Sequence, residues 1–318
     1  MKLLVPVISA EDVVKCSTLS KNVAYYMGIS LAEWNKRFGM HDDLNRMSEF
    51  RSTANTNGFD VVKHVCDAAG QNDVYVTINA GCYSCEQLDY LDEIIMHLAN
   101  IGVTGIIAGD PYVVNIIKKY RLKAVASTMV GVYNAEIAAF CRDIGFDRLI
   151  LPRDLTIEEI AEIVNRVPNV EYECFLMRNG CRYSDSNCLG RHSDKYGAIC
   201  TYLDKSKTTF CSTKPLNFIQ HEKILFNHLA FSQAYQKQAC GMCAIWDLMK
   251  NGITAGKIVG RADGFDALVN DIICAEENIE ISGQCYSRYD YLTQMKMPYN
   301  YDSICYRGCN CYYPEIRF

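Results

Sequence analysis

The fold of this chain is decided by the stretch LKAVASTMVGVYNAEIAAFCRDIGFDRLILPRDLTIEEIAEIVNR, residues 122–166. Apolar residues recur in it first with the spacing of a buried strand and then with the spacing of a helix, twice over. The predicted elements are strands at 122–127 and 147–151 and helices at 134–143 and 156–166. The second helix opens with Thr156 followed by Glu159, which is the pattern of a capping box.

The same alternation runs through most of the chain. Further strands are predicted at 2–8, 23–28, 74–79, 103–108, 170–176 and 256–260, and further helices at 86–99 and 242–250. Alternating strands and helices predict parallel pairing through right-handed crossovers. Eight strands therefore predict a single α/β domain, a (β/α)8 barrel, whose chemistry should lie at the C-terminal ends of the strands.

Two stretches interrupt this pattern. Residues 30–60 are polar and punctuated by Asn, Thr and Gly, and we interpret them as a lid or a long loop. A Cys-rich insertion follows the seventh predicted strand. We accordingly divide the chain into four parts. Residues 1–176 form the first part of the barrel and 177–241 the insertion, and residues 242–283 close the barrel before a Tyr- and Cys-rich tail at 284–318.

Composition indicates a folded protein and favours a small substrate over a nucleic acid. With 318 residues, 49% of them hydrophobic, the chain can bury the core of one barrel-sized domain. A formal net charge of −5 and the absence of a long Lys/Arg run argue against a nucleic-acid partner. The N-terminal apolar run is too short for a signal peptide, and no run approaches the roughly 20 apolar residues of a membrane span. We therefore expect a cytoplasmic protein without a membrane partner.

Seventeen cysteines are unusual in a reducing compartment, where disulfides are rare and exposed thiols are oxidised. Some are therefore expected to bind metal, and their number hints at an anaerobic host. Four of them, separated by six, eleven and thirty-nine residues, are Cys181, Cys188, Cys200 and Cys240. Iron–sulfur clusters accept four thiolates from separate loops, whereas structural zinc usually shows two close pairs. Only Cys240 and Cys243 form such a pair here, and buried, inert thiols are the alternative.

Two other groups of cysteines carry a weaker signal. Cys82 and Cys85 form a lone CxxC motif directly after a predicted strand, which suits either redox chemistry or packing. The tail contains Cys305, Cys309 and Cys311, which could bind a second metal. Packing or surface exposure is favoured for these three, because no fourth ligand is evident.

Charged residues near the ends of predicted strands form a second candidate site. Arg153, Lys257 and Arg261 lie at or just after strand ends, where fixed cations can bind an anionic substrate such as a dicarboxylate. Asn79 ends the third predicted strand on the same side of the barrel. Ordinary ion pairs at the barrel rim are the alternative.

Two carboxylates occupy the seventh predicted strand. Glu171 and Glu173 flank a tyrosine, so both face the same side of the sheet. If that side is the barrel interior, they need a cationic partner such as Arg153 or Lys257. Such a carboxylate suits a catalytic acid or base, or a purely structural ion pair.

The order and spacing of these motifs resemble the collagenase-like peptidase family that includes the ubiquinone-hydroxylation proteins UbiU and UbiV. The similarity covers roughly residues 70–265. The residues that carry it are Glu173-Cys-Phe175, Cys181, Cys188, Cys200, Cys240 and Lys257-Ile-Val-Gly-Arg261, with Ser127, Asn134, Leu151-Pro-Arg153-Asp154-Leu155, Glu159-Ile160 and Gly252-Ile253.

The resemblance implies a barrel-like fold with a [4Fe–4S] cluster on Cys181, Cys188, Cys200 and Cys240. It further implies oxygen-independent hydroxylation of a quinone precursor or an RNA base, with prephenate as the oxygen source and co-substrate. Short members of the family resemble the small-molecule enzymes. We therefore predict a hydroxylase-type enzyme with catalytic residues Glu173 and Arg153 and substrate-binding residues Asn79, Lys257 and Arg261.

The sequence departs from the family pattern at three places. Met177-Arg178 replaces the usual His-Gly, Asp185-Ser186 replaces a Ser-Gly, and Val259 replaces an acidic residue. These changes keep the four cysteines but leave the substrate open. Two alternatives remain, a peptidase of this family and a non-catalytic iron–sulfur subunit of a heteromeric complex. For the protein itself, a homo-oligomer and a heterodimer with a family homologue are both open. A peptidase that relied on the lost His could not work here.

Overall fold

Eight parallel strands close into a barrel in this computed structural model, which describes residues 1–39, 44–46, 54–181, 185–186, 238–298 and 310–316. The strands follow one another around the barrel in chain order, and the last pairs with the first. They are β1 (Lys2–Pro6), β2 (Val23–Ser30), β4 (Val74–Ile78), β5 (Gly105–Ala108), β6 (Lys123–Ala126), β7 (Arg148–Ile150), β8 (Glu171–Met177) and β9 (Ala255–Ile258). The predicted (β/α)8 fold and its eight strands are confirmed.

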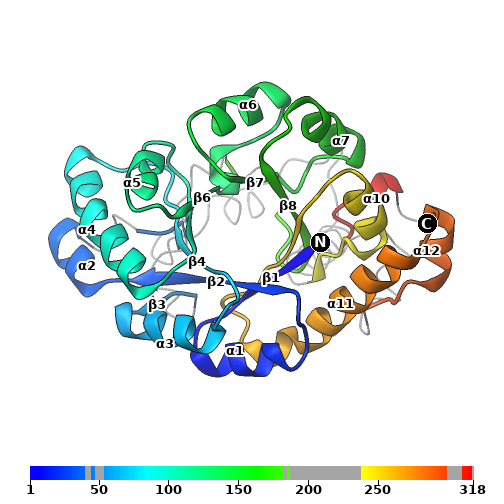
Figure 1. The fold of residues 1–318 in the computed structure, drawn as a ribbon, viewed down its shortest axis with the longest axis horizontal. Helices are drawn as coiled ribbons and strands as arrows, with labels where there is room; N and C mark the ends of the chain where they lie inside the picture. The colour runs from blue at the N-terminus through cyan, green and yellow to red at the C-terminus, as the bar shows by residue number, and fades with distance from the viewer. Residues whose placement is uncertain (40–43, 47–53, 182–184, 187–237, 299–309, 317–318) are drawn as a thin grey trace, which may run out of the picture.

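Helices surround the barrel on its outer side (Figure 1). They are α1 (Ala10–Ser17), α3 (Phe59–Ala69), α4 (Cys85–Ile101), α5 (Val113–Lys119), α6 (Ala135–Asp143), α7 (Ile157–Arg166), α10 (Ile245–Lys250) and α11 (Val269–Gln284). The predicted capping box of α7 is present, because the Glu159 N–H donates to the Thr156 hydroxyl at 3.2 Å and the Thr156 N–H donates to the Glu159 carboxylate at 2.8 Å. No described helix is long and apolar enough to cross a membrane.

The prediction of a lid or long loop at 30–60 was wrong for two parts of that segment. It contains the helix α2 (Ala32–Phe38) and the short strand β3 (Thr56–Asn57), which pairs with the end of β2 outside the barrel. Although this segment is polar in composition, Trp34 is fully buried, and its ring centroid lies 4.7 Å from that of Phe38. This tryptophan packs the helix against the protein. The tail likewise contains a helix, α12 (Arg288–Gln294).

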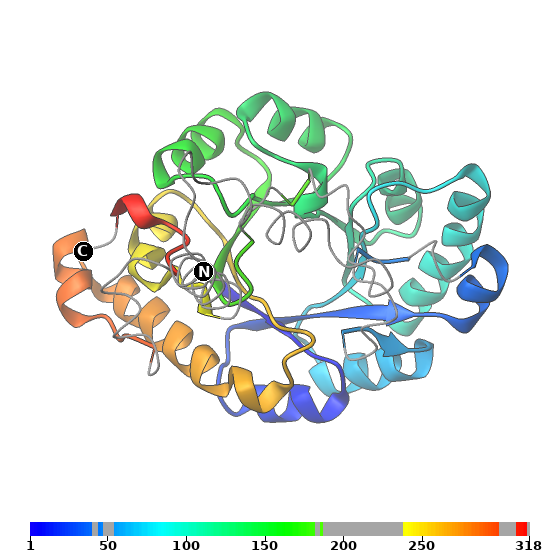
Figure 2. The same ribbon diagram turned by 180° about the vertical axis from the view of Figure 1, so that it is seen from behind.

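The C-terminal segment returns to the barrel. In both views its red end lies beside the yellow α10 (Figure 2). Its last described element is a 3-10 turn, η4 (Pro314–Ile316), and a similar turn, η2 (Met242–Ala244), precedes α10. Of the predicted insertion at 177–241, the ranges 182–184 and 187–237 lie outside the described residues.

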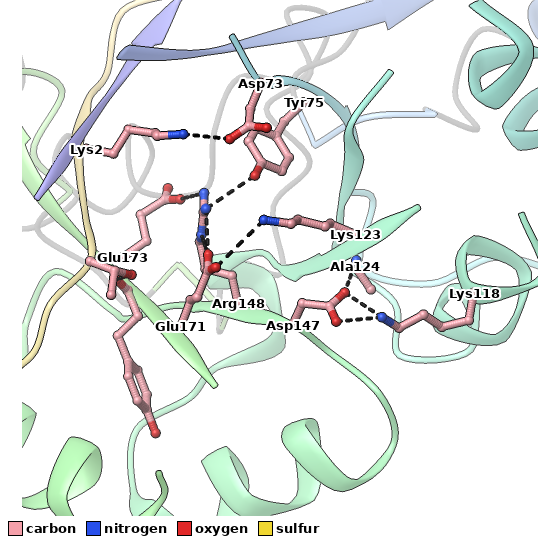
Figure 3. Close-up of polar contacts among 12 residues, drawn as sticks. Lys2, Asp73, Tyr75, Lys118, Lys123, Ala124, Asp147, Arg148, Glu171 and Glu173 are labelled. Carbon is pink, nitrogen blue, oxygen red and sulfur yellow. Dashed lines mark hydrogen bonds and ion pairs between the residues drawn. The ribbon is translucent and has the colours of Figure 1, made fainter. Parts of the chain in front are cut away.

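Ion pairs close the N-terminal end of the barrel (Figure 3). Arg148, the first residue of β7, lies with its guanidinium 2.6 Å from the carboxylate of Glu171, the first residue of β8, and it donates to the Tyr75 hydroxyl at 3.2 Å. Lys2, the first residue of β1, pairs at 2.8 Å with Asp73, which directly precedes β4, and β2 lies between these two strands. This end of the barrel is therefore held by cations that each have a carboxylate partner.

Candidate anion and metal site

A buried ion pair lies in the barrel interior between β8 and β9. The Lys257 ammonium donates to the Glu173 carboxylate at 2.8 Å, and the Glu173 side chain is fully buried. The expected pairing of Glu173 with Lys257 is confirmed, and Arg148 provides a second cation at 3.6 Å that the sequence did not reveal. Burial lowers the pKa of Lys257, while the Glu173 carboxylate opposes that shift.

The Lys257 ammonium also lies 4.0 Å from the ring centroid of Tyr26 in β2, a cation–π contact. The Tyr26 phenol is buried and donates to the carbonyl of Ile258 at 3.0 Å, which fixes the ring. Burial raises the pKa of Tyr26 above its usual value. This tyrosine therefore stays neutral and forms an aromatic wall beside the cation.

Arg261, just after β9, differs from the other cations at the C-terminal end of the barrel. Its guanidinium donates to the Thr77 hydroxyl at 2.8 Å and to the Asn55 side-chain carbonyl at 3.3 Å. Within the described part of the chain, no carboxylate lies within ion-pair distance of it. Burial lowers its pKa. Among the described residues, the guanidinium of Arg261 is therefore held by neutral hydrogen-bond partners.

A glycine makes the position of Arg261 possible. A Cβ added to Gly28, inside β2, would overlap both an Arg261 guanidinium nitrogen and the Asn55 oxygen. Glycine in a strand interior weakens the strand and often marks such a close approach. The single glycine in the apolar run of β2 is the one sequence signal that could have pointed to this contact.

Arg153 and Arg46 share a carboxylate that the sequence reasoning missed. Asp185, whose side chain is 2% exposed, lies 2.6 Å from Arg46 and 2.9 Å from Arg153. Arg153 therefore pairs with Asp185 and not with Glu171 or Glu173. Its guanidinium also lies 4.2 Å from the ring centroid of Phe175.

Asn79 lies at the barrel mouth as predicted, and it positions Arg46. Its side-chain oxygen accepts the Arg46 backbone N–H at 3.1 Å, and its amide donates to the Ser127 hydroxyl at 3.5 Å. The same short segment is held by the Tyr83 phenol, which donates to the Leu44 carbonyl at 2.7 Å. Loops after several strands thus bring these cations to one end of the barrel.

Two of the four predicted metal ligands can be placed. Cys240 is buried, and its segment forms an antiparallel bridge with Met177 at the end of β8. Cys181 is half-buried and follows four residues after Met177. Cys188 and Cys200 lie outside the described residues. Among the residues that are described, no three Cys, His, Asp or Glu side chains form a metal-sized group.

Cys181 and Cys240 nevertheless suit the implied cluster, because iron–sulfur clusters are held by thiolates and both thiols flank the same strand end. Phe175 connects this region to the cations. One contact of its ring is Arg153, and another is Tyr312, at a centroid distance of 5.9 Å. Arg153 also donates to the carbonyl of Asn179, two residues before Cys181.

The CxxC motif is not folded into a tight turn. Cys82 and Cys85 are exposed, and the chain between them runs without a turn to Ser84, which has the extended backbone angles φ −71° and ψ 164°. Ser84 caps α4, with its hydroxyl accepting the Gln87 N–H at 3.2 Å. In the tail, Cys305 and Cys309 lie outside the described residues, whereas Cys311 is described and half-buried.

Most of this chain matches the model of one known protein family. The model of peptidase family U32 matches residues 46–280, which is more than half of the sequence. This chain belongs to peptidase family U32. The family resemblance drawn from the sequence is thereby confirmed. The barrel-like fold that the resemblance implied is the fold observed.

Curated members similar to this chain are named for hydroxylation. A protein of Escherichia coli named tRNA hydroxylation protein P is 26% identical over 36% of this chain and 26% of its own length. The tRNA hydroxylation protein P1 of Bacillus subtilis is 29% identical over 37% of this chain and 28% of its own length. The matched part is thus little more than a quarter of either relative.

Among solved structures, the U32 peptidase Mk0906 is similar, with 19% identity and a TM-score of 0.44. That match covers 56% of this chain and 69% of the other.

Proposed function

We propose that this U32-family chain is an iron–sulfur enzyme of the oxygen-independent hydroxylase type that binds an anionic oxygen donor, such as prephenate, at Arg261. The observation that carries the proposal is the environment of Arg261, which combines a fixed guanidinium with neutral hydrogen-bond partners only, among the described residues. A carboxylate can accept two parallel hydrogen bonds from such a group.

The neighbouring residues suit the orientation of such a ligand. Thr77 and Asn55 fix the guanidinium, and Lys257 adds a positive charge that Glu173 holds in place. Glu173 is fully buried and bonded to Lys257, so we propose that it acts by positioning this cation. Arg153 contacts Asp185 and Phe175 and donates to the carbonyl of Asn179, and it keeps its proposed catalytic role.

A [4Fe–4S] cluster bound by Cys181 and Cys240, together with Cys188 and Cys200, would supply one-electron chemistry beside this site. Support comes from the contacts of Phe175, which touches Arg153 and Tyr312, and from the hydrogen bond between Arg153 and the Asn179 carbonyl. These contacts support the proposal, because they lie at or after the C-terminal ends of strands, where (β/α)8 enzymes carry their active sites.

Two substrate classes compete for the proposed reaction. A small molecule is our first choice, because the net charge is −5 and the sequence contains no long basic run. A tRNA base is the second choice, because the curated relatives are named tRNA hydroxylation proteins. This chain matches little more than a quarter of either relative, so their names support the second choice less strongly.

Anaerobic purification tests the proposal. The protein should be brown and contain about four iron and four sulfide per chain, the content of a cubane cluster. Iron-free, colourless protein under these conditions would overturn it. With labelled prephenate as donor, transfer of oxygen to a quinone precursor or to tRNA would then identify the substrate, and cleavage of casein that is lost in Cys181→Ala would favour a peptidase instead.

A further inference from the structure

The carboxylate closest to Arg261 in the sequence belongs to Asp263, and these two described residues do not form an ion pair. The Asp263 N–H donates to the Gly260 carbonyl at 2.9 Å, so residues 260–263 form a turn that contains Arg261. A Cβ added to Gly260 would lie 2.9 Å from a carboxylate oxygen of Asp263. The side chain of Asp263 is therefore folded back over the start of this turn.

Two residues after β8 hold the Asp263 carboxylate in this position. The side-chain amide of Asn179 donates to the same carboxylate oxygen at 3.0 Å, and a guanidinium nitrogen of Arg178 lies 3.8 Å from it. The Asp263 side chain is 33% exposed, so these contacts, and not burial, determine where its carboxylate lies. They join the loop after β8 to the loop after β9, which follow paired strands.

The backbone at Arg178 and Asn179 is fixed independently of Asp263. Both residues have left-handed angles, φ 63° and φ 49°, which are unfavourable for most residues other than glycine, although Asn tolerates them. The Arg178 N–H donates to the Ala239 carbonyl at 2.7 Å, and its guanidinium binds Asp271 of α11. The Tyr312 phenol donates to the Arg178 carbonyl. These contacts determine the direction in which the Asn179 amide points.

An unrestrained Asp263 would compete with an anionic ligand for Arg261. The two residues are two positions apart, so their Cα atoms are separated by at most about 7 Å, which an arginine side chain can span. Arginine and carboxylate form strong, charge-assisted hydrogen bonds. Such an internal pair would have to break before a ligand could bind, and the apparent affinity falls by the fraction of molecules in which the binding group is engaged elsewhere.

We propose that Asn179 is a positioning residue that sequesters the Asp263 carboxylate and thereby keeps Arg261 open to its anionic ligand. The inference rests on the anion site of the proposed function and adds to it a residue that acts only through Asp263. Arg178 assists with its guanidinium, which lies farther from the same carboxylate oxygen. The fraction of molecules in which Asp263 stays with Asn179 then sets the affinity for the anion.

The variant Asn179→Gly removes the amide and keeps the turn. Glycine adopts a φ of 49° readily and retains the backbone carbonyl that accepts the hydrogen bond from Arg153. Isothermal titration calorimetry of anaerobically purified protein should show the Kd of prephenate rise about 3- to 10-fold, which corresponds to roughly one hydrogen bond. The matched control is Asn169→Gly, because Asn169 is also left-handed, at φ 67°, but is exposed and precedes β8. Its Kd should equal that of wild type.

Removal of the Asp263 charge distinguishes sequestration from a purely structural role of Asn179. Asp263→Asn keeps the shape of the side chain but cannot form an ion pair with Arg261. Addition of Asp263→Asn to Asn179→Gly should therefore restore the wild-type Kd of prephenate. If Asn179 only stabilised the loop, the double variant would bind no better than Asn179→Gly. That result, or a wild-type Kd in Asn179→Gly itself, would overturn the inference.

Nuclear magnetic resonance separates this inference from the proposed function. In protein labelled with ¹⁵N-arginine, the Nε–H signal of Arg261, assigned by its loss in Arg261→Gln, reports whether a carboxylate pairs with the guanidinium. Without ligand, the signal should shift in Asn179→Gly and return in the double variant. If it does so in a protein that does not bind prephenate, the proposed anion site fails and the sequestration of Asp263 stands. If prephenate binds but neither the signal nor the Kd depends on Asn179, the inference fails and the anion site stands.

Discussion

Arg261, at the C-terminal end of the barrel, differs in its partners from the cations at the N-terminal end. At the N-terminal end, Arg148 faces Glu171 at 2.6 Å and Lys2 faces Asp73 at 2.8 Å, so each of these charges has a carboxylate partner. At the C-terminal end, Arg261 has neutral partners only, within the described part of the chain. Carboxylates therefore compensate these two charges at the N-terminal end, whereas within the described residues no carboxylate lies at ion-pair distance from Arg261.

Glu173 lies between the two ends, since it contacts Lys257 on one side and Arg148 on the other. The carboxylate of Glu173 therefore pairs with Lys257, the proposed substrate-binding residue, and also helps to neutralise Arg148 at the N-terminal end. A change at Glu173 should therefore affect both ends, whereas changes at Arg261 or Glu171 should affect only one.

Replacement of Glu173 by Gln should have the largest effect on stability. It leaves the buried ammonium of Lys257 without its carboxylate partner, and the loss of one partner of a buried pair costs about 3–5 kcal/mol. Urea unfolding of anaerobically purified protein measures the change in the free energy of unfolding. Glu280→Gln, on the exposed side of α11, is the matched control and should change it by less than about 0.5 kcal/mol. A Glu173→Gln variant as stable as this control would show that the pair contributes little.

Replacement of Arg261 by Gln should weaken anion binding while leaving the fold intact. Hydrogen bonds to a charged group contribute about 1.5–3 kcal/mol, which corresponds to roughly a 10- to 150-fold rise in the Kd of a dicarboxylate. Isothermal titration calorimetry of both proteins with prephenate measures this change. Arg166→Gln, at an exposed ion pair on α7, should leave the Kd unaltered. Equal affinity of Arg261→Gln and wild type for prephenate would show that the anion does not bind at Arg261.

The contrast between the ends also explains which features the sequence could predict. Strands of a parallel barrel are covered on both faces, so they appear as short apolar runs such as VTGIIA, and all eight were found. The helix α2 was missed because a single buried residue, Trp34, anchors it among polar neighbours. Periodicity needs several buried positions before it gives a signal.

The site was predictable only in part, for a similar reason. Lys257 was one of two cations expected to pair with Glu173, and the structure selects it because the two residues lie on strands that pair with each other. Arg46 and Asp185 are 139 residues apart and lie on loops, whose course no local pattern determines. The backbone bridge between Cys240 and Cys311 likewise depends on where the tail returns to the barrel.

Replacement of Gly28 by Ala should reduce anion binding indirectly. The new methyl group would overlap the Arg261 guanidinium and the Asn55 oxygen, and overpacking of this kind costs about 1–3 kcal/mol. We therefore expect a displaced Arg261 and a higher Kd for prephenate, accompanied by a lower urea midpoint. Gly81→Ala is the matched control, because a Cβ there would meet only the end of Met129 at 3.6 Å. Unchanged binding in Gly28→Ala would mean that Arg261 can move without loss of the site.

Replacement of Glu171 by Gln should have the smallest effect and isolates the N-terminal end. The side chain of Glu171 is 40% exposed, and pairs of such exposure contribute about 0–1 kcal/mol. Arg148 would keep its hydrogen bond to Tyr75 and its proximity to Glu173, so its charge stays compensated. Urea unfolding should show this small loss, and calorimetry should show an unchanged Kd for prephenate. A weaker Kd in Glu171→Gln would show that Arg148 and Glu173 transmit changes from the N-terminal end to Lys257, and the two ends would then form one electrostatic unit.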